Sequence, residues 1–155
     1  MQKIFAVSLA AVALSFALVG CGPGEPTIAA TNPTGKLGGA AWSMKKATIT
    51  RDGSSIDVKL FGDDVADCAS TSDKGYIMFS MPATVGKRPL KLSFNFTDPA
   101  TQTVTFFTPP SNNNIASEGL LNLTDLTETS ATLGLSVKSG SDNEVNGTFT
   151  TTICK

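Results

Sequence analysis

The sequence contains no histidine. This absence removes the commonest general base, the commonest metal ligand and every Ser-His or Cys-His nucleophile pair. Charged residues are scarce as well, at 16% of the chain, against about 25% in typical globular domains. The 12 Lys and Arg residues nearly balance the 13 Asp and Glu residues, so the formal net charge is −1. Such a balance argues against binding by phosphate neutralisation, and we expect no nucleic-acid partner.

The chain also lacks an apolar run long enough for a membrane-spanning helix. Its longest predominantly apolar run, residues 4–19, is uncharged, follows Lys3 and ends before Gly22-Pro23. A spanning helix needs roughly 20 apolar residues, and a stop-transfer segment has Lys or Arg after the run. The pattern therefore predicts a cleaved signal peptide over residues 1–20.

Four residues at the end of this run are more specific. Leu18-Val19-Gly20-Cys21 resembles the lipobox of bacterial lipoproteins: an aliphatic residue, a small or aliphatic residue, Gly or Ala, then Cys. The resemblance implies that the Cys21 thiol receives a diacylglyceryl group, that the signal is cut before Cys21, and that a fatty acid such as palmitate caps the new N-terminus. The membrane is then a partner through a lipid anchor. In such lipoproteins an Asp directly after the lipidated Cys resembles an inner-membrane retention signal. Residue 22 is Gly instead, which favours the outer membrane of the cell envelope. The alternative is an ordinary signal peptide with a chance cysteine.

The segment after Cys21 has the composition of a linker. Residues 22–35 contain three prolines, three glycines and almost no large apolar side chain. We therefore predict a flexible tether over residues 21–36 and a folded domain over residues 37–155. As a flexible coil, the tether would span on the order of 20 Å.

The rest of the chain alternates short apolar and polar positions between turn residues, the pattern of β-strands and hairpins. No helix is expected after the signal peptide. We predict an all-β domain, an antiparallel β-sandwich of about eight short strands, with a small β-barrel as the alternative. The expected strands are 40–51 with a bulge at 45–46, 56–60, 76–81, 90–97, 102–108, 118–123, 131–137 and 145–153. The expected loops and turns are 62–75, 82–89 and 109–114.

Three cysteines leave an even number once Cys21 is assigned to lipid. An exported chain is in a compartment that permits disulfides, so we predict a Cys68–Cys154 bond. By strict alternation Cys154 lies on the outer face of its strand with Thr150 and Thr152, which places the bond at the domain edge. A redox or metal-binding pair is the alternative, but there is no C-x-x-C spacing to support it.

Short motifs of serine β-lactamases occur at Ser43–Lys46, 138–140 and 141–143. We reject them because S-x-x-K begins a helix in those enzymes, whereas residues 40–51 predict a strand. K-S-G also directly precedes S-D-N, although it should lie far downstream. We expect no enzyme activity, no catalytic residue and no cofactor.

The predicted 62–75 loop carries Asp63, Asp64 and Asp67. Carboxylate oxygens suit a hard cation such as Ca²⁺, with Asp63 and Asp67 as the weak candidate ligands. No EF-hand pattern is present, and the alternative is a solvated polar loop.

The mature region also resembles, over about a third of its length, a loose class of small β-sandwich lipoproteins with a Gly-x-x-Trp-like opening strand and a V-x-G-x-F closing strand. Residues 38–42, 118–123 and 145–149 carry this likeness. We interpret the protein as a non-enzymatic, lipid-anchored envelope protein with a binding or structural domain. The partner is a protein or a glycan, contacted through loops 62–75 and 109–117. The alternative is a carbohydrate- or small-ligand-binding module, for which Trp42 and Tyr76 are the aromatic candidates.

Overall fold

The computed structural model describes residues 24–92, 102–116 and 118–154. The signal peptide, Cys21 and most of the predicted 90–97 strand lie outside these ranges. The described residues form strands, turns and loops without a helix, which confirms the all-β prediction. In this described part of the chain, there is no helix that is long and apolar enough to cross a membrane.

The described residues contain eleven strands rather than about eight. The strands are β1 (Thr34–Leu37), β2 (Ala40–Ser43), β3 (Lys46–Asp52), β4 (Ser55–Phe61), β5 (Tyr76–Pro82), β6 (Gly86–Pro89), β7 (Thr105–Thr108), β8 (Asn112–Ile115), β9 (Glu118–Leu126), β10 (Ser130–Ser139) and β11 (Asn143–Cys154).

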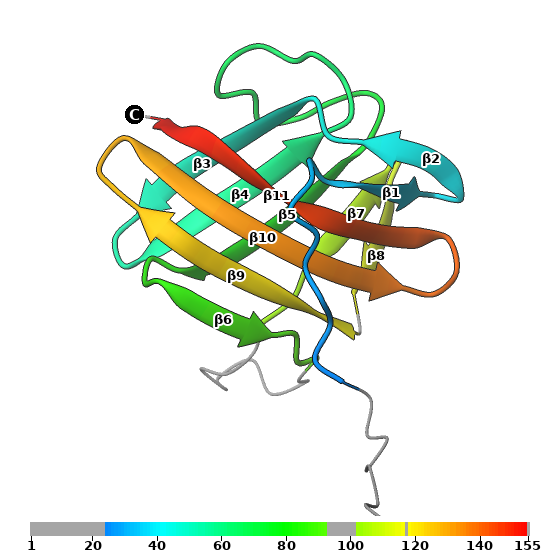
Figure 1. Cartoon of the computed structure of the whole chain (residues 1–155). Helices are drawn as coiled ribbons and strands as arrows, with labels where there is room; N and C mark the ends of the chain where they lie inside the picture. Colours follow the sequence, from blue (N-terminus) through cyan, green and yellow to red (C-terminus); the bar gives the residue numbers. More distant parts are fainter. Residues whose placement is uncertain (1–23, 93–101, 117, 155) are drawn as a thin grey trace, which may run out of the picture.

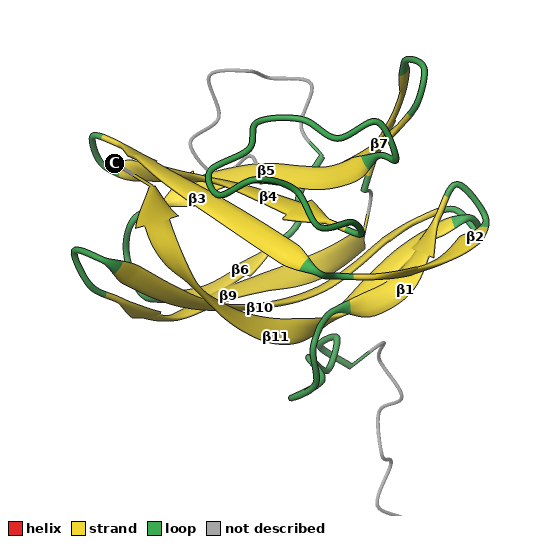
Figure 2. Cartoon of the chain, turned by 90° about the horizontal axis from the view of Figure 1, so that it is seen from above, coloured by secondary structure: helices red, strands yellow, loops and turns green. Residues whose placement is uncertain are grey.

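The strands form one curled, open sheet in the order β6-β9-β10-β11-β3-β4-β5-β7-β8, with β1 on β11 and β2 on β1. Figure 1 shows β9, β10 and β11 as a near layer, and Figure 2 shows this layer facing that of β3, β4 and β5. Strand β11 joins the layers, because it pairs along β10 and its last residues pair in parallel with β3 at Ile153–Ile49 and Cys154–Thr50. This parallel pair departs from the predicted purely antiparallel sheet.

The core lies between the two layers and follows the predicted alternation. On β4, Ile56, Val58 and Leu60 are buried, while Asp57 and Lys59 point outward. On the facing layer the buried residues include Leu133, Leu135, Val137, Val145 and Phe149. These positions alternate because side chains of a strand point to opposite faces, and only one face of each layer meets the other.

Three predicted non-strand segments contain strands. Strand β1 lies in the predicted tether, β6 in the predicted 82–89 turn and β8 in the predicted 109–114 loop. Each has only four residues, too few for a clear alternation, and each gains its hydrogen bonds from a distant or adjacent partner: β11, β9 and β7 respectively. The predicted 40–51 strand is also divided into β2 and β3. Met44 and Lys45 lie between these two strands and do not form the predicted bulge within one strand.

The predicted flexible tether is docked on the sheet over much of its length. Asn146 accepts a hydrogen bond from Ala29 N at 2.8 Å and donates one to Thr27 O at 3.0 Å. Thr148 donates to Ala29 O at 2.8 Å. We call residues 25–33 the strap, which Figure 1 shows in blue across the face of β10 and β11. The prediction of a flexible segment up to residue 36 was wrong for the strap because distant side chains bind its backbone.

Candidate functional site

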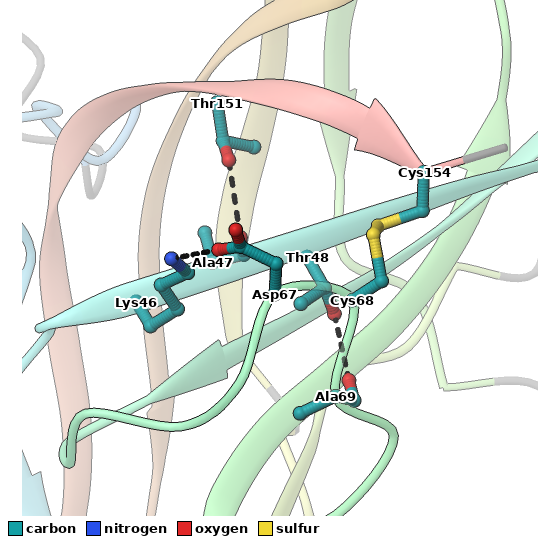
Figure 3. A network of polar contacts seen from close by, with 8 residues as sticks. All are labelled: Lys46, Ala47, Thr48, Asp67, Cys68, Ala69, Thr151 and Cys154. Atoms are coloured by element: carbon teal, nitrogen blue, oxygen red, sulfur yellow. Dashed lines mark hydrogen bonds and ion pairs between the residues drawn. A yellow bond between two sulfur atoms is a disulfide. The ribbon is translucent and has the colours of Figure 1, made fainter.

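The 62–75 loop is held to the end of β11 by a disulfide. Cys68 and Cys154 are bonded, with their Cα atoms 5.7 Å apart. Figure 3 shows the loop residue Cys68 meeting Cys154 beside strand β3. The predicted pairing and its place at the domain edge are confirmed. Cys154 lies on the outer face of its strand, as predicted, because the loop that carries Cys68 lies on the outer face of β3 and β4.

Hydrogen bonds from the outer faces of β3 and β4 hold the middle of the loop. Thr48 Oγ1, on a side chain that is almost fully buried, donates to Ala69 O at 3.3 Å. Lys59 Nζ donates to Ser70 O at 2.8 Å. The loop is therefore a fixed part of the surface, although it contains no strand.

An ion pair joins Lys46 on β3 to Asp67 in the loop (Figure 3). The hydrogen bond and the charge of Lys46 hold the pKa of Asp67 below its ordinary value. The same contact with Asp67 raises the pKa of Lys46. Asp67 is exposed and Lys46 is partly exposed to solvent, so the pair orients the loop more than it stabilises the fold.

The structure does not gather the candidate cation ligands. Asp67 faces Lys46, and Asp63 accepts hydrogen bonds from Ser72 Oγ at 2.8 and 2.9 Å. Among the described residues, no group of three or more Asp, Glu, Cys or His side chains is placed to hold a metal ion. The acidic residues instead fix the conformation of the loop.

Beneath the loop, three aromatic rings form a row across neighbouring strands. Phe61, Tyr76 and Phe107 are in register on β4, β5 and β7. The Phe61 and Tyr76 ring centroids are 5.7 Å apart, and those of Tyr76 and Phe107 are 4.8 Å apart. We call these rings the aromatic row. Phe61 is fully buried, whereas Tyr76 and Phe107 are half-buried, so the row opens toward β7.

The open end of the aromatic row lines a hollow of about 330 Å³. Two segments that sequence reasoning selected as contact loops, 62–75 and 109–117, meet here. The lining residues are Thr71, Ser72, Asp73, Tyr76, Phe107, Pro109 and Pro110. We call this hollow the loop hollow. Its floor of aromatic and proline rings with hydroxyl and carboxyl groups around it suits a ligand that has both apolar faces and polar edges.

A second, more polar hollow of about 490 Å³ lies on the other side of the β7–β8 hairpin. Its lining includes Asn112 and Asn114 of β8 and the turn between β10 and β11. Ser139 Oγ donates to Ile115 O at 2.8 Å, which ties the hairpin to this turn. Residues 112–114 are three consecutive asparagines, and two of them thus line a concave surface in a segment that was predicted to be a loop.

Of the two aromatic candidates, only Tyr76 lies at a hollow. Trp42 packs on the core, and a Cβ on Gly62 would lie 2.5 Å from Trp42 Nε1. The Trp42 indole N–H is buried and has no hydrogen-bond partner in the described part of the chain. Trp42 is therefore a packing residue against the start of the 62–75 loop and does not offer a free stacking face.

Sequence reasoning missed Phe107 and the aromatic row. One signal was present: residues 76–81 are largely apolar on both faces, which implies that the outer face is partly covered as well. Tyr76, at the start of this segment, lies beside residues 71–73 of the disulfide-bound loop, whereas Met78 and Ser80 line a separate hollow. Comparisons with protein-family models, with curated proteins and with solved structures found no match to this chain.

Proposed function

We propose that the protein is a non-enzymatic, lipid-anchored protein of the bacterial cell envelope, on the outer membrane, that binds a partner through the loop hollow. The supporting observation is that both segments around this hollow are fixed: the 62–75 loop by the disulfide and hydrogen bonds from Thr48 and Lys59, and the 109–117 segment by the β7–β8 pairing and the hydrogen bond from Ser139 to Ile115. A surface ordered before binding loses less conformational entropy on binding. In this proposal the two facing layers act as a β-sandwich scaffold that presents end loops.

The lipobox at Cys21 supports the anchor, and the Cys68–Cys154 bond is consistent with export to an oxidising compartment. A fatty chain on Cys21 would hold the domain at a membrane, where diffusion is restricted to the surface. Binding a fixed envelope component suits such a protein, because anchoring raises the local concentration of the pair.

In-cell photo-crosslinking tests this function. A photoreactive phenylalanine analogue would replace Thr71 or Pro110 at the loop hollow, and Thr124 on β9 would be the matched exposed control. We expect covalent adducts of one defined mass from the two hollow positions and not from Thr124. Equal adducts from all three positions would contradict the site. Mass spectrometry of the mature N-terminus, with Cys21→Ser as the control, tests the lipid separately.

A glycan is the second candidate partner, and the pairing of Tyr76 with Phe107 at the hollow favours it. Aromatic rings bind the apolar faces of sugars, and the nearby Thr71, Ser72 and Asp73 can hydrogen-bond sugar hydroxyls. NMR titration with cellobiose and chitobiose should shift the Tyr76 and Phe107 ring signals, while those of buried Phe149 stay unchanged. Unshifted ring signals at saturating disaccharide would exclude these sugars and leave a protein partner.

A further inference from the structure

The outer face of the near layer carries one row of residues in register across four strands. Thr148 on β11 pairs with Gly134 on β10, which pairs with Asn122 on β9, which pairs with Lys87 on β6. A row of this kind runs perpendicular to the strands. It leads from the middle of the layer to β6, which is the edge strand of the sheet.

The strap follows this row from β11 toward its edge. Thr148 donates to Ala29 O at 2.8 Å, and the next strap residue toward the N-terminus, Ile28, lies on Gly134. A Cβ on Gly134 would lie 2.7 Å from Ile28 Cγ2, so only glycine leaves room for this contact. The chain therefore crosses β10 where the layer has no side chain.

At the edge, Glu25 forms an ion pair with Lys87, with 2.6 Å between Glu25 Oε2 and Lys87 Nζ. The chain thus leaves the domain beside β6. Cys21 is four residues earlier in the sequence, and four residues reach at most about 14 Å when extended. A lipid on Cys21 would hold β6 within that distance of the membrane surface.

The region around β6 also exposes apolar side chains. Among the described residues only three large hydrophobic side chains are exposed: Val85, Leu92 and Ile115. Val85, just before β6, is 62% exposed, and Leu92, three residues after it, is 44% exposed. Apolar side chains placed next to a lipid anchor add to membrane affinity by burying their area among the headgroups.

We propose that the β6 edge, with Val85 and Leu92, rests on the phospholipid surface, and that the docked strap sets this orientation. The inference rests on the proposed lipidation of Cys21. The 62–75 loop lies at the opposite end of the molecule, at the top of Figure 1, while the described chain begins at the bottom. The loop hollow then faces away from the membrane, where a partner can reach it.

Fluorescence quenching at a membrane tests the orientation. The full-length protein, purified from bacterial membranes and placed in phosphatidylcholine vesicles, would carry an NBD label on Val85→Cys or on Thr71→Cys. The lipidated and disulfide-bonded native cysteines do not react with the label. Spin-labelled headgroup lipids should quench most of the emission from position 85 and little of that from position 71.

Gly134→Val tests the role of the strap. The valine favours a strand but occupies the space of Ile28, so the strap should detach and the quenching difference between positions 85 and 71 should be lost. Thr132→Val is the matched control, because Thr132 Oγ1 contacts Thr150 and not the strap. With this control the difference should persist.

The outcomes separate the two proposals. A mature protein without acyl mass overturns the lipid anchor and the orientation together. An acylated protein with equal quenching at both positions overturns only the orientation. Unequal quenching that survives Gly134→Val overturns the role of the strap.

Discussion

The 62–75 loop and the strap are two irregular segments on opposite layers of the same sheet. Both are rich in small, polar or turn-forming residues, and both are fixed against the outer face of a layer. They differ in what fixes them. The loop has a disulfide and lies over the aromatic row. The strap instead has hydrogen bonds with the side chains of Asn146 and Thr148, and its Ile28 packs on Gly134.

The two segments show that an irregular segment can be ordered either by a disulfide with apolar burial or mainly by hydrogen bonds. The loop buries apolar area and closes a covalent ring, so its order is part of the stability of the domain. The strap contributes mainly backbone hydrogen bonds at a partly exposed face, each with a modest net free energy. We therefore expect the loop to unfold with the domain and the strap to detach before it.

Removing the disulfide should give the largest effect. The bond joins residues 86 apart, and in the chain-entropy model the variant Cys68→Ser/Cys154→Ser loses about 4–5 kcal/mol of unfolding free energy. Urea unfolding of the variant and of the parent measures the loss, with the reduced parent as the control. An unchanged free energy would show that noncovalent contacts alone order the loop.

The aromatic row should show a gradient from its closed end to its open end. Phe61→Ala leaves a cavity under the loop and should cost about 3 kcal/mol, whereas Phe107→Ala at the half-buried end should cost about 1–2 kcal/mol. Urea unfolding of both variants checks the order. The reverse order would show that the loop does not seal Phe61 from water.

Releasing the strap should cost less. Asn146→Ala with Thr148→Val removes three hydrogen bonds to the strap and should lower the unfolding free energy by about 1–2 kcal/mol. Amide exchange at Ala29, whose N–H donates to Asn146, should accelerate far more than exchange in the core strands. Thr150→Val, on the same outer face but bonded to Thr132, is the control. Exchange that accelerates equally in the core would contradict independent detachment.

The smallest effect should come from pH acting on the Lys46–Asp67 pair. The pKa of Asp67 is lowered from 3.8, so its stabilisation is present above that value and is lost as the pH falls through the folded-state pKa. The pKa of Lys46 is raised from 10.5, so its contribution is lost only as the pH rises above that value. Asp67→Asn should flatten both ends of the stability profile slightly, and 1 M salt should do the same to the parent. Coincident profiles for the parent and Asp67→Asn would show that the pair contributes nothing.

Sequence reasoning succeeded where the signal is local. Alternation predicted strands over residues 56–60, 131–137 and 145–153, and these residues lie in β4, β10 and β11 with their apolar side chains mostly inward. It failed for β6 and β8, because a four-residue strand is defined by its partner more than by its own pattern. For the candidate site, the sequence predicted the two contact loops. It did not predict that they line one hollow together with Phe107.

By itself, the sequence determined the all-β class, the faces that pack inward and the Cys68–Cys154 pair, because side-chain alternation and cysteine parity are properties of the chain alone. The tertiary structure alone decided that β11 crosses between the layers, that the strap docks over Gly134 and that Tyr76 and Phe107 share a hollow. These features depend on contacts between residues far apart in the chain. Each depends on which surfaces come into contact when the layers pack, and a local sequence pattern carries no information about those contacts.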